Sequence, residues 1–203
     1  GLILLSGWDK KSHFVDGMCG SGTFLVEAAM IGANIPANIN REHFAFQDWP
    51  DYDEALWKLI RSSQLKRAQD CYGRVIGYDL NPDTVASAKL NIANSGLEDY
   101  IEIHCENFFE TKKPEGPTHL VFNPPYGVRI QGDIPEMYKS IGDTLKKNYS
   151  GAEAWFLTSH MDGLKHVGLR ASRKIEIYQA KLECRFVKYE MYQGSKKMKY
   201  KQV

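Results

Sequence analysis

The chain has 203 residues, of which 43% are hydrophobic and 25% are charged, a balance typical of a folded globular domain. No apolar run approaches the roughly 20 residues that a membrane-spanning helix needs. The formal net charge is +1, which excludes a protein that coats nucleic acid through overall basicity but not one with a local basic patch.

Strand and helix patterns alternate along the chain, which predicts βαβ units and a mostly parallel sheet. Asn81, Pro82 and Gly96 provide start and stop signals for one helix between two strands. The last two β segments are joined so tightly that we expect them to be antiparallel. The expected strands are 13–16, 74–79, 100–105, 118–122, 153–158, 174–179 and 181–192, and the expected helices lie at 23–31 and 82–95.

A segment at about 32–73 interrupts this alternation. It contains clustered aromatic residues and a helical pattern from Asp53 to about Gln69, for which Asp51 or Asp53 is the expected cap. We interpret it as an insertion that covers one edge of the functional site. The alternative is a packing helix that has no part in the chemistry.

The four cysteines are scattered and form no Cys-x-x-Cys pair, so the sequence predicts neither a disulfide framework nor a zinc site. The six histidines show no ligand spacing, so no metal is expected. This cysteine usage favours a reducing cytoplasm.

A glycine turn joins the first strand to its helix, with the sequence Asp16-Gly17-Met18-Cys19-Gly20-Ser21-Gly22-Thr23. Backbone N–H groups at such a helix start are unpaired and point toward a ligand. A dinucleotide fingerprint would require glycine where Leu25 stands, and a P-loop would require a lysine before the threonine. The turn is therefore not built for a diphosphate.

Polar residues at three neighbouring strand ends indicate which cofactor the turn holds. Asp16 suits a cationic amino group and a sulfonium, Asp79 can accept hydrogen bonds from ribose hydroxyls, and Asn107 can offer a carboxamide to adenine. Together they predict S-adenosylmethionine. The alternatives are an anion at the helix N-terminus for Asp16 and a helix cap for Asp79.

The fourth strand ends in Asn123-Pro124-Pro125-Tyr126, where ligands of doubly wound sheets bind. The Asn123 side-chain oxygen and the Pro124 carbonyl can accept both protons of an exocyclic amine, which leaves its lone pair available for a methyl group. Catalysis would then come from placement and fixed dipoles. Tyr126 can stack on a planar base. The alternative is a proline-rich turn with a buried tyrosine.

These motifs, together with Gly127-x-Arg129 and the aromatic insertion, resemble the bacterial THUMP-type N2-guanine methyltransferases of ribosomal RNA over nearly the whole chain. The resemblance implies a class I methyltransferase: a doubly wound, Rossmann-like, mostly parallel sheet of seven strands whose last strand is antiparallel. It implies one domain over residues 1–203 that lacks the family's N-terminal RNA-binding region, so we expect a fragment.

The resemblance also implies residue roles. Asn123, Pro124, Pro125 and Tyr126 would hold the guanine, and Arg129 would bind RNA. S-adenosylmethionine would be bound by Asp16, Gly17, Met18, Cys19, Gly20, Ser21, Gly22, Thr23, Asp79, Leu80, Asn107, Phe108 and Asn123. This chain departs from the family at two positions, because Gly17 stands where proline is usual and Asn107 where aspartate is usual.

The expected activity is therefore transfer of a methyl group from S-adenosylmethionine to the N2 amine of a guanine in RNA, within large-subunit ribosomal RNA. A DNA adenine-N6 methyltransferase would use the same mechanism, but no target-recognition domain is visible. The glutamine methylase of release factors would use the same tetrapeptide without the aromatic insertion. From another class, a noncatalytic RNA-binding module could keep the fold, although Asn123 and Tyr126 are intact.

Overall fold

In the computed structural model, which describes residues 1–125 and 133–192, a seven-stranded sheet has the strand order β3-β2-β1-β4-β5-β7-β6. All neighbouring strands pair in parallel except β7, which is antiparallel to both β5 and β6. The strands are β1 His13–Asp16, β2 Val75–Asp79, β3 Ile101–Cys105, β4 Thr118–Phe122, β5 Glu153–Thr158, β6 Arg173–Gln179 and β7 Leu182–Glu190. The predicted class I, doubly wound fold is confirmed.

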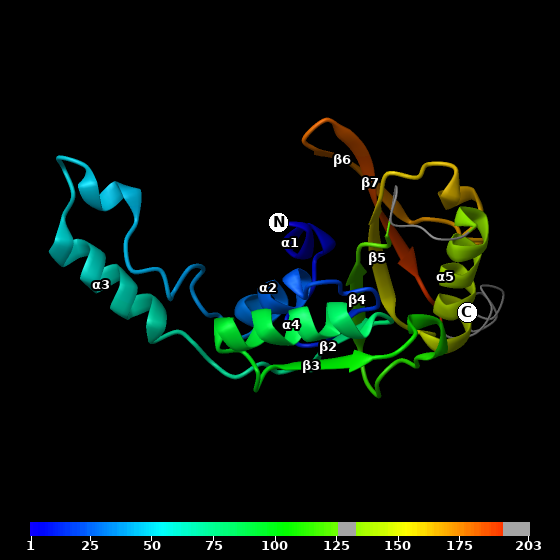
Figure 1. Cartoon of the computed structure of the whole chain (residues 1–203), viewed down its shortest axis with the longest axis horizontal. Helices are drawn as coiled ribbons and strands as arrows, with labels where there is room; N and C mark the ends of the chain where they lie inside the picture. Colours follow the sequence, from blue (N-terminus) through cyan, green and yellow to red (C-terminus); the bar gives the residue numbers. More distant parts are fainter. Residues whose placement is uncertain (126–132, 193–203) are drawn as a thin grey trace, which may run out of the picture.

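Helices cover both faces of the sheet, because its central strands are apolar on both sides. One core layer contains Phe14, Val75 and Trp155 and packs against α2, while the opposite layer contains Val15, Leu120 and Phe156 and packs against α5. Figure 1 shows α1, α2 and α4 on one side of the sheet and α5 on the other. The helices are α1 Leu2–Ser6, α2 Thr23–Gly32, α3 Glu54–Leu65, α4 Pro82–Ser95 and α5 Ile134–Asn148, with short 3-10 turns η1 Ala45–Asp48, η2 Phe108–Glu110 and η4 Gly163–Lys165.

Helix α4 begins and ends where its sequence signals indicate. The Asn81 side chain accepts hydrogen bonds from the backbone N–H groups of Asp83 and Thr84, at 2.9 and 3.3 Å. Pro82 occupies the first turn, and Gly96 closes the helix with a left-handed φ of 66°. This helix follows β2 directly, so its N-terminus lies at the same sheet edge as the strand end.

The aromatic segment forms an arm that stands apart from the sheet (Figure 1). Helix α3 has no buried residue, and Asp53 caps it by accepting from the Leu56 N–H at 2.9 Å. The arm has its own small aromatic cluster, in which Phe46 and Trp57 have ring centroids 5.0 Å apart. At its base, the Gln69 N–H donates to the Ala33 carbonyl at 2.9 Å.

The expectation that this segment covers one edge of the site is wrong. The alternative, a packing helix that has no part in the chemistry, stays a prediction, since α3 contributes Trp57 to the aromatic cluster of the arm. The arm leaves the body after the C-terminal end of α2 and returns at the N-terminal end of β2, whereas the functional cleft lies at the carboxyl ends of the strands. None of the residues that line this cleft lies between positions 25 and 78.

Candidate active site

A cleft of about 1350 Å³ lies beyond the carboxyl ends of β1, β2 and β4. This is the edge at which doubly wound sheets bind their ligands. The sequence-predicted residues that line it are Asp16, Gly17, Met18, Cys19, Gly20, Ser21, Thr23, Asp79, Leu80, Asn107, Phe108, Asn123, Pro124 and Pro125. The structure therefore brings together residues that are separated by up to about half the length of the chain.

The glycine turn has the backbone conformation that only glycine adopts easily. Gly20 has a φ of 54° and Gly22 a φ of 83°, both in the left-handed region. The Cys19 N–H donates to the Tyr78 carbonyl at 2.9 Å, which ties the turn to the end of β2. Gly22 was also expected to bind the cofactor, but it is buried under α4 as the N-cap of α2 and does not line the cleft.

Position 17 requires glycine because an aromatic ring approaches it closely, and not because its φ is unusual. A Cβ at this position would lie 2.5 Å from Cδ2 of Phe108, closer than non-bonded carbon atoms approach. Phe108 belongs to η2 and is itself buried against Phe122 and Tyr149, with ring centroids 5.4 and 5.5 Å away. The ring thus occupies the space that a side chain at position 17 would need.

The Asp16 carboxyl lies at the end of β1 and is buried. It accepts a hydrogen bond from the Met18 N–H at 3.1 Å. Burial raises the pKa of Asp16 to about 8, the Met18 hydrogen bond opposes this rise, and the negative charge of Asp79 adds to it. A cation placed beside Asp16 would reverse this balance and favour the carboxylate.

Cys19 lines the same part of the cleft but has no nucleophilic character. Burial, together with the charges of Asp16 and Asp79, raises the pKa of its thiol far above the ordinary value. The thiol therefore stays protonated and acts as a small apolar wall.

The Asp79 carboxylate links β2 to the glycine turn. One oxygen accepts from the Gly20 N–H at 3.0 Å and the other from the Asn81 N–H at 2.9 Å. Each carboxylate oxygen can accept about two hydrogen bonds, so both retain capacity for a ligand. The alternative that Asp79 caps the helix is wrong, because Asn81 is the N-cap of α4 and Asp79 accepts only from the Asn81 N–H there. Its contact with ribose hydroxyls stays a prediction.

Asn107 lines the cleft while its amide already has local partners. Its Oδ1 accepts from the Phe109 N–H at 3.1 Å, and its Nδ2 donates to Oε1 of Glu110 at 3.3 Å. These bonds make it the N-cap of η2 and fix the orientation of its side chain. A ligand contact by Asn107 would use the remaining lone pair or the second amide proton.

Asn123 provides the most informative atom of the cleft. Among the described residues, its Oδ1 is the only buried side-chain nitrogen or oxygen atom without a hydrogen-bond partner. Such an orphaned acceptor costs about 1–3 kcal/mol unless a ligand donor satisfies it. Pro124, which is buried, and Pro125 follow it and contribute no backbone N–H. Tyr126 and Arg129, both predicted site residues, lie outside the described residues.

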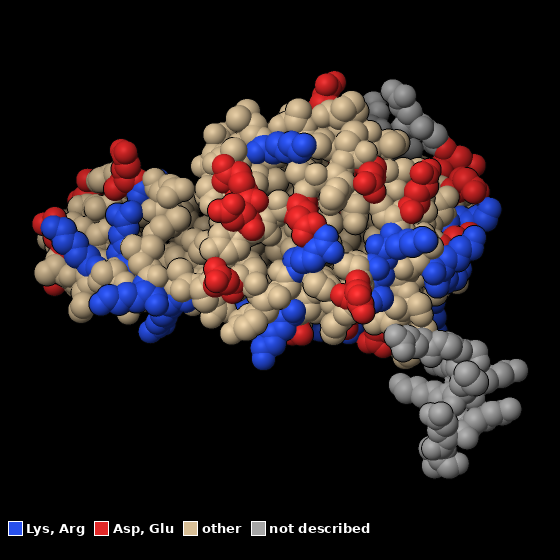
Figure 2. All heavy atoms as spheres, turned by 90° about the horizontal axis from the view of Figure 1, so that it is seen from below, with Lys and Arg blue, Asp and Glu red and all other residues tan. Residues whose placement is uncertain are grey.

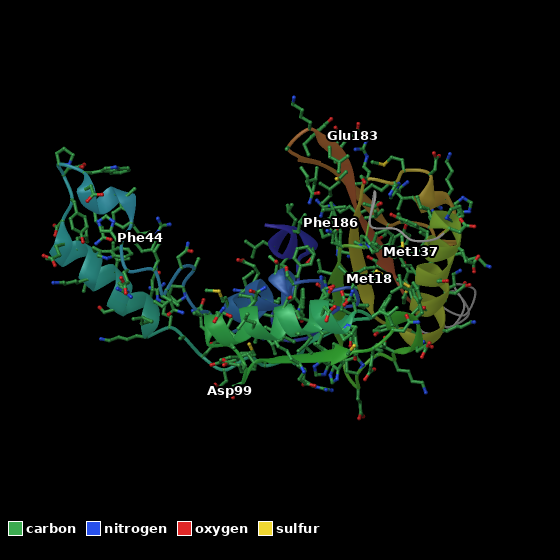
Figure 3. All side chains as sticks on the ribbon, in the orientation of Figure 1. Met18, Phe44, Asp99, Met137, Glu183 and Phe186 are labelled. Carbon is green, nitrogen blue, oxygen red and sulfur yellow. The ribbon has the colours of Figure 1, made fainter. Side chains whose placement is uncertain are left out.

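Two methionines line the cleft on different elements. Met18 belongs to the glycine turn and Met137 to α5, and Figure 3 shows where the two lie in the fold. Methionine adapts its shape to an apolar ligand surface. Sequence reasoning missed Met137 because it did not predict α5. The other lining residues that it missed are Phe24, Asn81, Pro82, Asp83, Thr84, Phe109 and Asp133, of which Asn81 to Thr84 could have been found from the helix start after β2.

The rest of the described chain gives no sign of a metal site or a membrane span. Within residues 1–125 and 133–192, no group of three or more His, Cys, Asp or Glu side chains is arranged to hold a metal ion. No helix in these same ranges is both long and apolar enough to cross a membrane.

Comparison with known proteins gives concordant matches. The family model of UPF0020, described as RMKL-like, methyltransferase domain, matches residues 1–188. The chain is 31% identical over 202 residues to the ribosomal RNA large subunit methyltransferase K/L of Shewanella frigidimarina (strain NCIMB 400), covering 96% of this chain and 28% of that protein. It is 32% identical over 194 residues to the "Putative RNA methyltransferase slr0064" of Synechocystis sp. (strain ATCC 27184 / PCC 6803 / Kazusa), covering 94% of this chain and 50% of the relative.

Among solved structures, SMU.472 complexed with SAH superposes with a TM-score of 0.87 at 33% identity. That match covers 96% of this chain and 52% of the other. The chain thus spans between about a quarter and a half of the length of these relatives.

Proposed function

Because the chain belongs to UPF0020, the family of RMKL-like methyltransferase domains, we propose that it transfers a methyl group from S-adenosylmethionine to the exocyclic N2 amine of a guanine in RNA. The proposed substrate is large-subunit ribosomal RNA. The names of the relatives support an RNA substrate. The Asn123-Pro124-Pro125-Tyr126 motif supports an exocyclic amine as the acceptor, and the resemblance of the aromatic insertion and of Gly127-x-Arg129 supports guanine N2.

The residues of the cleft fit S-adenosylmethionine. Asp16 is a buried carboxyl with a single backbone donor, so it can pair with an ammonium or a sulfonium. Asp79 keeps acceptor capacity on both oxygens for ribose hydroxyls. Met18, Phe108 and Phe109 offer apolar surface for a purine. When bound, this cofactor supplies an electrophilic methyl group.

Asn123 carries the proposal for the acceptor. Its buried Oδ1 has no partner among the described residues and can accept one proton of an exocyclic amine. The Pro124 carbonyl would accept the second proton, because prolines at 124 and 125 offer no competing N–H. With both protons engaged, the lone pair of the amine is free and its direction is fixed. These are preorganised dipoles, which need no general base, because the methylated amine can release its extra proton to water after the new carbon–nitrogen bond has formed.

The experiment that tests this proposal compares wild type with Asn123→Ala on unmodified large-subunit ribosomal RNA. We expect the variant to bind S-adenosylmethionine within severalfold of wild type in calorimetry, and its kcat to fall roughly a hundredfold to a thousandfold. Asn40→Ala, which removes an exposed asparagine of the arm, is the matched control and should keep wild-type kcat.

Nucleoside mass spectrometry of the methylated RNA identifies the acceptor. N2-methylguanosine is the expected product, and RNA in which inosine replaces guanosine should accept no methyl group because it lacks the amine. N6-methyladenosine as the product would overturn the guanine proposal. Near-wild-type kcat in Asn123→Ala would overturn the role of Asn123.

The finer identity of the protein also remains a proposal. Membership of the THUMP-type group, a cytoplasmic location and the division of residues 1–203 into one domain with an insertion at about 32–73 rest on the sequence and its resemblance. Figure 2 shows acidic and basic side chains interspersed on the face seen from below Figure 1. That face therefore presents mixed charge, and we expect RNA contacts to come from local sites.

A further inference from the structure

A second cavity, of about 450 Å³, lies on α5 beside the active-site cleft. Both hollows adjoin the N-terminal end of α5: Asp133 and Met137 line the cleft, while Ile134 and Pro135 line the second cavity. The remaining lining residues of the second cavity are Ser159, His160, Met161, Asp162, Gly163 and His166.

The turn that lines the second cavity packs on Tyr138. The buried hydroxyl groups of Tyr138 and Thr158 share a hydrogen bond, and Oγ1 of Thr158 also accepts from the His160 N–H at 2.9 Å. Gly163 lies flat on the Tyr138 ring, because a Cβ there would be 2.8 Å from the ring carbons. The backbone of the turn after β5 is thus fixed to α5 by polar and apolar contacts.

The lining of this cavity combines flat surfaces with hydrogen-bonding groups. His160 and His166 contribute imidazole rings, and Met161, which is 36% exposed, contributes apolar surface beside Ile134 and Pro135. Imidazole rings stack on nucleobases that are splayed out of a single strand and can hydrogen-bond to their edges. The cavity volume lies within the range of small-ligand pockets, which suits one base.

The charged residues near the second cavity are compatible with the binding of a polyanion there. The Asp162 carboxylate is paired with Nζ of Lys165 at 2.7 Å, so it presents no uncompensated negative charge. The acids Asp133 and Glu136 flank the lining residues Ile134 and Pro135, and Glu136 is paired with Nζ of Lys139 at 3.2 Å. Besides Lys165, residues 163–175 contain three Lys or Arg residues and no acid. An RNA backbone that enters here meets no net electrostatic repulsion from this segment.

We propose that the second cavity holds a nucleobase adjacent to the target nucleotide in the RNA strand. This proposal rests on the proposed RNA methyltransferase function, and it assigns to the cavity the recognition of the base beside the target. His160 and His166 stack on or hydrogen-bond to this base, and Tyr138 positions the turn that carries His160. Holding a neighbour offsets part of the unstacking of the target base, which amounts to a few kcal/mol.

The test is a binding cycle that requires no catalysis. A short, single-stranded, fluorescein-labelled RNA with one central guanosine is titrated at low salt with wild type and with the His160→Ala/His166→Ala double variant. The same titrations use RNAs with an abasic site at each position next to the guanosine. His43→Ala, on the arm, is the matched control. Circular dichroism checks that each variant is folded.

We expect the double variant to bind the intact RNA about tenfold more weakly, the effect of losing one stacked base. Wild type should bind one of the abasic RNAs more weakly by a similar factor. The loss of affinity caused by the double variant and the loss caused by that abasic site should not add, because both remove the same contact. His43→Ala should bind like wild type. Equal affinity of the double variant and wild type, full additivity at every position, or no measurable binding by wild type would overturn the proposal.

Methyl-transfer assays of the same proteins separate this proposal from the proposed function. Non-additive binding without methyl transfer by wild type to any RNA would retain the base site and reject the methyltransferase proposal. Methyl transfer that depends on Asn123, without coupling in the binding cycle, would retain the function and reject the base site. In an active enzyme, the double variant should raise KM for RNA and leave the affinity for S-adenosylmethionine unchanged.

Discussion

We predict that Asp16 makes cofactor binding depend on pH. Its folded-state pKa is raised to about 8 from an ordinary value of 3.8, mainly because burial disfavours the charge. At pH 7 the carboxyl of the ligand-free protein is therefore mostly protonated. Pairing with the ammonium or sulfonium of the cofactor requires the carboxylate, so binding must release a proton. Affinity should then increase about tenfold per pH unit below pH 8, one proton per ligand.

The same shift fixes the sign of the effect on stability. Between the unfolded-state pKa and the folded-state pKa, the folded protein retains a proton that the unfolded chain has lost. The free energy of unfolding therefore falls by about 1.4 kcal/mol per pH unit between about pH 4 and pH 8, on the order of 5 kcal/mol in total from this group. Asp16→Asn removes this dependence, so the variant should be more stable than wild type at pH 8 and should bind the cofactor more weakly.

Isothermal titration calorimetry at pH 6, 7 and 8 checks the linkage, with each pH measured in two buffers of different ionisation enthalpy. Wild type should release close to one proton at pH 6 and pH 7 and fewer at pH 8, where the ammonium of the ligand begins to lose its own proton. Asp16→Asn should release none. Asp83→Asn removes a carboxylate from an exposed position of the same cleft and should keep the wild-type slope. Wild-type affinity independent of pH, without proton release, would refute the reasoning.

Two further substitutions probe the turn. Asp79→Ala removes the carboxylate that accepts from the Gly20 and Asn81 N–H groups. We expect calorimetry to show cofactor binding weakened by about 1.5–3 kcal/mol. Unchanged affinity in a folded variant would contradict this role. Gly17→Ala drives a Cβ into the Phe108 ring, so urea unfolding should show a free energy of unfolding lower by about 1–3 kcal/mol. The additional change Phe108→Leu should recover part of that loss. An unchanged unfolding midpoint in Gly17→Ala alone would contradict the prediction, because it would show that the Phe108 ring moves aside at no cost in stability.

The strands of the fold could be predicted almost to the residue because local signals and burial agree. Strands β1, β4 and β5 have the predicted bounds, and α4 begins and ends at Asn81 and Gly96 as expected. Helix α3 was predicted too long because its amphipathic pattern continues to Gln69. The chain leaves the helix after Leu65, since Gln69 has to reach the Ala33 carbonyl at the base of the arm.

The position of the arm could not be derived from its composition. Aromatic residues such as Phe44 and Trp57 indicate a packed cluster, but the pattern does not say whether that cluster packs on the body or on itself. Strand polarity could have decided the matter, because a segment between the end of α2 and the start of β2 joins the sheet at its amino-terminal edge. This topological signal was present in the predicted elements.

The predicted cofactor residues share one cleft because they lie at or just after strand ends, and parallel strands bring these ends to one edge. Contacts that arise from tertiary packing were not predictable. Phe108 closing over Gly17 joins positions far apart in the chain, and Met137 reaches the cleft only through the orientation of α5. The local partners of Asn107 likewise depend on how η2 turns after β3. Whether each predicted residue contacts the cofactor stays a prediction.

Helix α2 and strand β2 both connect the arm to the cleft and pack against each other. Each has one end at the base of the arm and the other at the glycine turn or at Asp79, and each is about 15 Å long. Leu25 lies so close to Gly77 that a Cβ there would be 2.3 Å from its Cδ1, which prevents the two elements from sliding past each other. A load on the arm would therefore displace Gly22 and Asp79 together, so the start of α2 and the end of β2 would keep their spacing.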